Sequence, residues 1–196
     1  MHHYYTKSRR LSRARILISD VIRGVSVEFY TYSDIFSAKT IDEGTRLLIE
    51  TAIVPEKGVI LDMGCGYGAI GITLVKAQPG LRAVLVDSNP RAIEAAKMNA
   101  RLNRVEDRVD IRLGDLYEPV RGETFDAIIS NPPLAAGWKI IEKLISEAPA
   151  FLKENGSLQL VFRKGEAKAE QLLRKHFKRV EKLARKHGYT VFYAEP

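Results

Sequence analysis

The chain has 196 residues, 45% of them hydrophobic and 28% charged, with a formal net charge of +7; this composition excludes a disordered chain and suits one globular domain, with or without a short appendage. The single cysteine, Cys65, excludes an intramolecular disulfide framework. No apolar run approaches the roughly 18 residues that cross a membrane, and residues 1–10 lack the apolar segment of a secretory signal, so we expect a cytoplasmic protein with no membrane partner.

The first quarter of the chain predicts a small extension in front of the main domain. Residues 1–21 are expected to be a basic N-terminal arm or helix, and residues 22–196 a single domain. Residues 26–36 alternate apolar and polar side chains like a small β-hairpin. Residues 42–53 have the spacing of a helix, with Asp42 as its N-cap.

From Val59 onward the chain alternates predicted strands and helices. The predicted strands are 59–63, 82–87, 109–113, 125–130 and 157–162, and the predicted helices are 69–77, 91–103, 138–152 and 167–177. Asn155-Gly156 is expected to turn the chain into the fifth of these strands. Residues 180–185 and 188–194 are expected to pair antiparallel through a turn near Gly188. This order predicts an α/β, Rossmann-like, doubly wound fold, with a mainly parallel sheet, an antiparallel C-terminal edge hairpin and the small N-terminal hairpin and helix.

The positive charge is concentrated at the two ends of the chain. Residues 1–25 carry six Lys or Arg and one acid, and residues 163–196 carry ten Lys or Arg and four acids. Clusters of this kind attract polyanions, although a solvated surface also carries runs of charge. We therefore expect a nucleic-acid partner, and charge alone does not separate RNA from DNA.

A glycine-rich turn, Asp62-Met63-Gly64-Cys65-Gly66-Tyr67-Gly68, follows the strand predicted at 59–63. In a doubly wound sheet this turn binds nucleotide-like ligands, because glycine lets the backbone turn sharply and lets a ligand approach closely. The GxGxG spacing after Asp62 differs from the GxGxxG of dinucleotide-binding proteins. An acid two residues before Gly64 suits a ligand with a cationic amino-acid end. Asp62 can also form hydrogen bonds within the loop, and the two roles are compatible.

Two further acids end the next predicted strands. Asp87 lies 23 residues after Gly64, a spacing at which a carboxylate can accept both ribose hydroxyls of an adenosine. Asp115 ends the following strand, where it can reach an adenine amine. The sequence predicts no metal site, because the only cysteine is Cys65, which is expected to be a small packed residue, and the histidines are few and scattered.

Asn131-Pro132-Pro133 follows the strand predicted at 125–130. The two prolines fix φ and remove two N–H donors. The side-chain oxygen of Asn131 and the backbone carbonyl of Pro132 can both accept hydrogen bonds, so together they can hold a planar NH2 group by its two hydrogens. Such a grip aims the nitrogen lone pair at an electrophile, and no strong base is needed before attack.

These residues resemble the class I S-adenosylmethionine-dependent methyltransferases. The glycine loop, Asp87, Asp115 and Asn131-Pro132-Pro133 each match a motif of that group. More narrowly, residues 22–196 resemble the catalytic domain of the small-subunit ribosomal RNA guanine-N2 methyltransferases and their short archaeal single-domain relatives. Phe36-Ser37 and Asp42-Glu43-Gly44-Thr45 carry this narrower resemblance.

The resemblance implies that the cofactor is S-adenosylmethionine, that the acceptor is an exocyclic amine, and that the partner is RNA, in particular ribosomal RNA. It implies catalytic roles for Asn131, Pro132 and Pro133. The residues that it assigns to the cofactor are Thr45, Asp62, Gly64, Cys65, Gly66, Tyr67, Gly68, Asp87, Ser88, Asp115, Leu116 and Asn131. Larger relatives carry a second methyltransferase-like domain, which the basic ends or a second subunit are expected to replace, and the chain is expected to be a monomer or a homodimer.

One position departs from the family pattern. Many relatives have an aromatic residue directly after Asn-Pro-Pro to stack on the target base, and this chain has Leu134. Leu134, Phe36 and Trp138 are expected near the substrate. Either Trp138, Phe36, Tyr4 or Tyr5 stacks on the base or the target is not a base of the usual kind, and Trp138 also fits a core position on a helix.

Alternatives to an RNA guanine-N2 methyltransferase remain open from the sequence. A protein glutamine methyltransferase or an adenine amino methyltransferase would use the same Asn-Pro-Pro geometry, and a non-catalytic RNA-binding module could keep the fold. The intact Asp62, Asp87 and Asn131 disfavour the module. A nicotinamide dehydrogenase is disfavoured by the glycine spacing and leaves Asn-Pro-Pro unexplained.

Overall fold

The computed structural model describes residues 15–32 and 40–196. The N-terminal residues before Arg15, with Tyr4 and Tyr5, and the segment that contains Phe36-Ser37 lie outside the described residues.

The core is a seven-stranded sheet with the strand order β5-β4-β3-β6-β7-β9-β8. All neighbours pair in parallel except β9, which runs antiparallel to both β7 and β8. The strands are β3 (Lys57–Met63), β4 (Gly80–Asp87), β5 (Val109–Leu113), β6 (Phe125–Ser130), β7 (Leu152–Phe162), β8 (Arg179–Lys186) and β9 (Tyr189–Glu195). The mainly parallel sheet with an antiparallel C-terminal edge hairpin is confirmed.

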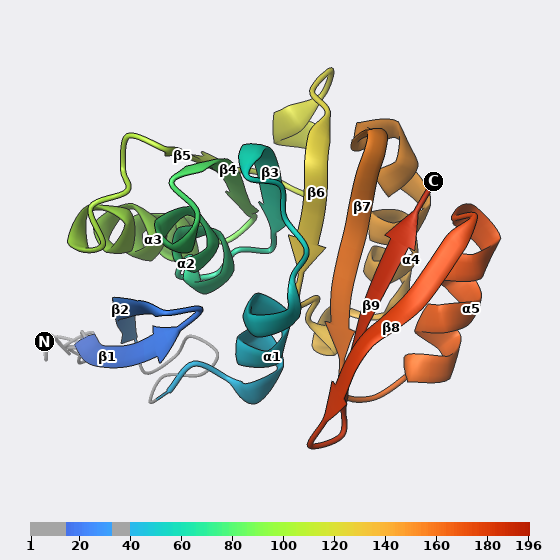
Figure 1. Cartoon of the computed structure of the whole chain (residues 1–196), viewed down its shortest axis with the longest axis horizontal. Helices are drawn as coiled ribbons and strands as arrows, with labels where there is room; N and C mark the ends of the chain where they lie inside the picture. The colour runs from blue at the N-terminus through green and yellow to red at the C-terminus, as the bar shows by residue number, and fades with distance from the viewer. Residues whose placement is uncertain (1–14, 33–39) are drawn as a thin grey trace, which may run out of the picture.

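Helices cover both faces of this sheet (Figure 1). They are α1 (Glu43–Thr51), α2 (Ala69–Ala77), α3 (Pro90–Leu102), α4 (Trp138–Glu147) and α5 (Glu166–His176). Helices α1, α2 and α3 pack with Ile60 and Ile129 of the sheet, whereas α4 and α5 pack with the adjacent Leu61 and Ile128. Side chains of successive strand residues point to opposite faces, so each central strand is buried on both sides and reads as a continuous apolar run. Within the described residues no helix is both long enough and apolar enough to span a bilayer.

The N-terminal hairpin is made of β1 (Arg15–Ile22) and β2 (Val25–Tyr32). Its turn is Arg23-Gly24, with φ angles of 52° and 77°, the backbone of a tight two-residue hairpin turn. The prediction of a hairpin within 26–36 was therefore wrong in position, and residues 15–21 are neither an arm nor a helix. The expected boundary at residue 21 falls inside β1. The turn after this strand was not predicted because it uses Arg23 in a left-handed conformation, which arginine rarely adopts.

Two asparagines of α3 attach this hairpin to the domain. Asn99 accepts a hydrogen bond from the backbone N–H of Tyr30 at 2.7 Å and donates to the backbone oxygens of Tyr30 at 3.0 Å and Tyr67 at 2.9 Å. One helical turn later, Asn103 accepts from the N–H of Glu28 at 3.2 Å and donates to its carbonyl at 2.7 Å. The two amides thus take the place of a neighbouring strand along the free edge of β2.

The segment before the fifth parallel strand also differs from its prediction. Helix α4 ends at Glu147, and a short 3-10 turn, Ala148–Phe151, leads directly into β7. Asn155-Gly156 lies inside β7, at an irregularity in its pairing with β6, and is not a turn. A Cβ on Gly156 would lie 2.8 Å from the carbonyl oxygen of Phe125, so glycine is required there by the close approach of two backbones.

We expect Asn99→Ala to lower the free energy of unfolding by about 2–4 kcal/mol, because backbone groups of Tyr30 and Tyr67 lose a buried partner. Urea unfolding measures this loss. Lys97→Ala, at an exposed position of the same helix, is the control and should change stability by less than about 0.5 kcal/mol. Equal stability of the two variants would contradict the role given to Asn99.

Candidate functional site

A cavity of about 530 Å³ opens at the carboxyl ends of the parallel strands. This is where open α/β sheets bind ligands. Its walls come from the loops after β3, β4, β6 and β7, from the start of α1 and α2, and from the first residue of β9. The lining residues are Asp42, Thr45, Gly64, Cys65, Gly66, Tyr67, Ala69, Ile70, Asp87, Asn131, Pro132, Pro133, Leu134, Ala135, Val161, Phe162, Arg163, Lys164 and Tyr189.

The glycine loop leaves its backbone open toward this cavity. Gly64 and Gly66 have φ angles of 71° and 56°, which favour glycine, and a Cβ built on either residue meets no atom within 4 Å. The space that side chains would fill is therefore free for a ligand in contact with the backbone. Gly68 is different, since its Cβ would lie 2.6 Å from the side chain of Ile72 and its role is close packing at the start of α2.

Hydrogen bonds fix the loop against the end of β4. The N–H groups of Gly64 and Cys65 both donate to the carbonyl of Val86, at 2.8 and 3.0 Å. The N–H of Gly66 donates to Asp87 Oδ2 at 2.8 Å, and the N–H of Asn89 donates to Asp87 Oδ1 at 2.8 Å. Asp87 is thereby held at the wall of the cavity beside the glycine loop.

Asp62 lies beneath the loop, fully buried, and does not line the cavity. Its Oδ2 accepts a hydrogen bond from the N–H of Gly71 at 2.8 Å, while its Oδ1 is buried without a partner in the described structure. Burial raises the pKa of this carboxyl to about 7, against the effect of the Gly71 hydrogen bond, and the charge of Asp87 raises it further. The contact that the structure provides for Asp62 is with the backbone of α2.

Asn131 is oriented by the beginning of α1. Its Nδ2 donates to Thr45 Oγ1 at 2.9 Å and to Asp42 Oδ1 at 3.3 Å. The same Asp42 oxygen caps the helix, as predicted, by accepting from the N–H groups of Gly44 and Thr45 at 3.1 and 3.0 Å. Because the NH2 group is held in this way and no described group donates to Asn131 Oδ1, that oxygen remains a hydrogen-bond acceptor.

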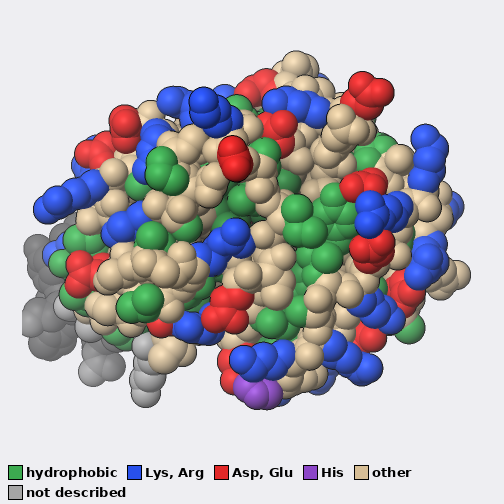
Figure 2. All heavy atoms as spheres, in the orientation of Figure 1, with side chains coloured by type: hydrophobic (Ala, Val, Ile, Leu, Met, Phe, Trp, Pro, Cys, Tyr) green, Lys and Arg blue, Asp and Glu red, His purple; other side chains and the backbone are tan. Residues whose placement is uncertain are grey.

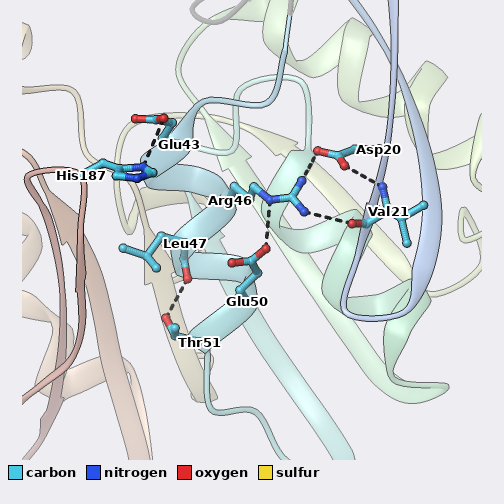
Figure 3. Close-up of polar contacts among 8 residues, drawn as sticks. All are labelled: Asp20, Val21, Glu43, Arg46, Leu47, Glu50, Thr51 and His187. Atoms are coloured by element: carbon cyan, nitrogen blue, oxygen red, sulfur yellow. Dashed lines mark hydrogen bonds and ion pairs between the residues drawn. The ribbon is translucent and has the colours of Figure 1, made fainter.

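Helix α1 is itself held from both sides (Figure 3). Toward the hairpin, the Arg46 guanidinium pairs with Asp20 and donates to the carbonyl of Val21 at 3.2 Å. At its first turn, Glu43 lies 3.4 Å from Nδ1 of His187, in the turn between β8 and β9. The helix start that carries Asp42 and Thr45 is thus fixed relative to both ends of the fold.

Several predicted site residues do not line the cavity. Asp115 is exposed, 4.0 Å from Lys143, and Gly68, Ser88 and Leu116 are also absent from the walls. Trp138 stacks on Phe162 with ring centroids 6.3 Å apart and contacts Lys168 on α5, so it packs in the helix layer. Trp138 does not line the cavity in the described structure, in keeping with the core position that the sequence also allowed, whereas Leu134 does line it.

One wall of the cavity was not predicted from the sequence. It is formed by Phe162, Arg163, Lys164 and Tyr189. The two cations directly follow the last residue of β7, and the neighbouring strand β6 is directly followed by Asn131. Their position at the end of a predicted parallel strand was a signal for them. Tyr189 had no such signal, because it begins a strand that runs the opposite way.

The four glutamates of residues 163–196 all form ion pairs with cations of the C-terminal basic cluster, and the cluster keeps an excess of positive charge. Lys and Arg side chains line the right-hand edge in Figure 2, over α5 and β8, and acidic side chains lie between them. Lys182 lies 2.7 Å from Glu170, and Arg179 lies 2.8 Å from Glu181. The hydrogen bond from Lys182 holds the pKa of the Glu170 carboxyl below its ordinary value. Because residues 163–196 contain ten Lys or Arg and four acids, this edge of the molecule still carries a net positive charge.

The family model of the methyltransferase small domain matches residues 26–193. The chain belongs to this family. The matched residues include the glycine loop, Asp87 and Asn131-Pro132-Pro133.

Individual relatives agree with this assignment. The uncharacterized protein YbxB of Bacillus subtilis is 35% identical over 164 residues, which cover 83% of this chain and 81% of that protein. The ribosomal RNA small subunit methyltransferase C of Hamiltonella defensa is 37% identical over 139 residues, which cover 69% of this chain and 40% of that enzyme.

A solved structure is also similar. The T. thermophilus 16S rRNA N2 G1207 methyltransferase, in complex with AdoMet and guanosine, superposes with a TM-score of 0.81 at 25% identity and covers 92% of this chain. The match spans 50% of that enzyme and 40% of the Hamiltonella enzyme, so this chain corresponds to about half or less of each of these ribosomal RNA methyltransferases.

We expect Asp62→Asn to remove a pH dependence of stability. The folded pKa of about 7 exceeds the ordinary value of 3.8, so the carboxyl stabilises the fold only while protonated, and wild-type stability falls as pH rises through this window. The free energy of unfolding of Asp62→Asn relative to the wild type should rise between about pH 4 and pH 7, by roughly 1.4 kcal/mol per pH unit, and level off above.

Chemical denaturation across this pH range measures the difference. Asp107→Asn, at an exposed carboxylate, is the control and should show no such trend. A constant difference for Asp62→Asn from pH 4 to pH 8 would show that the buried carboxyl is ionised throughout.

Proposed function

We propose that this protein is an S-adenosylmethionine-dependent methyltransferase that acts on an exocyclic amine, the N2 amine of a guanine in ribosomal RNA. The orientation of Asn131 carries the proposal. Its NH2 group is held by Thr45 and Asp42, so the side chain offers the cavity an acceptor. The amino group of a base is a matching donor.

The residues present fit this cofactor. The open space over Gly64 and Gly66 allows a ligand to contact their backbone, and Asp87 is fixed beside them with carboxylate oxygens that can accept further hydrogen bonds from ribose hydroxyls. When bound, the cofactor supplies an electrophilic methyl group on a positively charged sulfur. Asp62 supports the loop from below through Gly71, and we assign it this role.

At the amine, the chain acts by holding and aligning. Asn131 Oδ1 and the carbonyl of Pro132 accept the two amine hydrogens, which turns the nitrogen lone pair out of conjugation with the ring and toward the methyl group. The C–N bond would form as the methyl–sulfur bond breaks and S-adenosylhomocysteine leaves, and the amine would lose its proton afterwards, so no base is required in the first step. Alignment of this kind can contribute on the order of 7–11 kcal/mol when the geometry is ideal.

The choice of guanine in ribosomal RNA is supported by the relatives. The T. thermophilus enzyme is named for N2 methylation of 16S rRNA and was solved with guanosine. A paired guanine cannot present its amine to a cavity, so the target base must be unstacked and turned into the site.

Transfer of a tritiated methyl group from S-adenosylmethionine to total RNA, followed by nucleoside analysis, tests the proposal. Label in N2-methylguanosine supports it. Label in methyladenosine or in protein glutamine would overturn the assigned acceptor, and the absence of any transfer, together with the absence of S-adenosylhomocysteine binding by calorimetry, would overturn the proposed enzyme.

We predict that Asn131→Ala lowers kcat by at least about a hundredfold and leaves the Kd for S-adenosylhomocysteine within about threefold of the wild type. Asp87→Ala should do the opposite, weakening cofactor binding at least tenfold. Calorimetry and steady-state kinetics separate the two effects. Asn155→Ala, an exposed asparagine of β7, controls for loss of an amide elsewhere; normal turnover of Asn131→Ala at saturating cofactor would contradict its role.

We predict that Thr45→Val lowers kcat by roughly tenfold, since the loss of one hydrogen bond to Asn131 costs about 1 kcal/mol and loosens the amide. The volume of the side chain is almost unchanged. Thr51→Val, in the same helix, removes a hydroxyl that donates only to the carbonyl of Leu47 and should leave kcat unchanged. Equal kinetics of the two variants would show that Thr45 does not position Asn131.

A further inference from the structure

The charges around the cavity are distributed unevenly along the sheet. The glycine loop and Asp87 occupy the part over β3 and β4, and Asn131 stands at the end of β6 in the middle. Arg163 and Lys164 stand at the end of β7, on the far side of Asn131 from the glycine loop, and they are the only basic side chains that line the cavity among the described residues. An anionic substrate would thus meet positive charge beside Asn131 and away from the carboxylate assigned to the cofactor.

Arg163 is held in place by a ring stacked against backbone. Its guanidinium lies 5.5 Å from the centroid of the Tyr189 ring, a cation–π contact. The same ring lies on Gly44, where a Cβ would come within 2.6 Å of it. Glycine at position 44 therefore leaves room for the Tyr189 ring at the beginning of α1, and the ring packs directly against the Gly44 backbone.

Arg163 and Lys164 also differ from the cations of the C-terminal basic cluster that form ion pairs. Lys182, Arg179 and Arg174 each pair with a glutamate, whereas neither Arg163 nor Lys164 has an acidic partner in the part of the chain that the structure describes. Both are exposed, so no stability requirement of the core explains them. Their charges are free to act on a ligand at the mouth of the cavity.

We infer that Arg163 and Lys164 bind a backbone phosphate of the RNA next to the target guanosine, with Tyr189 as a positioning residue for Arg163. The inference rests on the proposed function and specifies the substrate as a nucleotide within a phosphodiester chain. Arginine suits phosphate because its planar guanidinium can donate two parallel hydrogen bonds. Neighbouring parallel strands lie about 4.8 Å apart, so cations after β7 adjoin the amine-holding oxygen of Asn131.

This contact also addresses the missing aromatic residue after Asn-Pro-Pro. Leu134 lines the cavity but cannot stack on a base as an aromatic ring does. Anchoring the phosphate fixes the nucleotide from its backbone, which leaves the base to be oriented by Asn131, Pro132 and the apolar wall.

Binding of a short, fluorescein-labelled, single-stranded oligoribonucleotide with one guanosine to the protein saturated with S-adenosylhomocysteine tests the inference. For Arg163→Gln we expect affinity to fall by about tenfold. We expect the slope of log K against log salt to become shallower by about 0.7, the value for one lost phosphate contact on a single strand. Lys164→Gln should act in the same direction. Lys175→Gln, an exposed cation of α5 that does not line the cavity, is the matched control and should change neither quantity.

A second oligoribonucleotide, with uncharged methylphosphonate linkages on both sides of the guanosine, identifies the ligand group. The wild type should bind it as weakly as Arg163→Gln binds the charged one, and Arg163→Gln should lose little more. If Arg163→Gln and Lys164→Gln bind the charged RNA like the wild type, or weaken the charged and uncharged RNAs equally, the inference is overturned.

The positioning role of Tyr189 has its own readout. Tyr189→Phe keeps the ring and should preserve the wild-type affinity and salt slope. Tyr189→Leu should reproduce the shallower slope of Arg163→Gln while the Kd for S-adenosylhomocysteine stays unchanged, which a general loss of structure would not do. These binding measurements need no turnover. An absence of methyl transfer would therefore contradict only the proposed function, and RNA binding that does not depend on Arg163, Lys164 or the phosphate charge would contradict only the phosphate site.

Discussion

A single carboxylate oxygen connects the folding of this domain to its site. Asp42 Oδ1 satisfies the first N–H groups of α1 and also accepts from the amide of Asn131. Helix formation leaves these N–H groups without partners inside the helix, so the cap is required for stability in any case. Here the same atom, together with Thr45, decides which way the amide at the end of β6 faces. The side chain of Asp42 thus both stabilises the beginning of α1 and orients the proposed acceptor, Asn131.

The second constraint is the way in which separate parts of the fold meet around α1 and the glycine loop. Arg46 ties α1 to the hairpin, and Asn99 ties the hairpin to the carbonyl of Tyr67 in the loop. The hairpin is outside the main sheet, yet through these contacts it supports both the amide and the loop from behind. The glycine loop and Asn131 form two walls of the cavity, and both lie in loops after strands and not within strands. Contacts from other elements are therefore needed to hold these two walls in place.

Much of this could be predicted from the sequence, and the exceptions have physical causes. Apolar runs and glycine placed the parallel strands, and strand ends brought the glycine loop, Asp87 and Asn131 to one edge. The hairpin was misplaced because its turn uses Arg23 at a positive φ. Arg163 follows a predicted parallel strand and could have been identified from that position, whereas Tyr189 could not, because it begins a strand that runs the opposite way. For Trp138 the sequence left a core position and a place beside the substrate both open, because the spacing of an amphipathic helix does not show which neighbour a side chain meets, here Phe162.

The strand order also gives the domain a protected border. Among the described residues β8 pairs only with β9. Its exposed positions carry arginine, lysine and glutamate, and Arg179 and Lys182 pair with acids on β9 and α5. An unpaired strand edge is a template for adding another chain, and a dense row of charges makes that addition unfavourable. The charged side chains of β8 therefore disfavour extension of the sheet by a strand of another molecule.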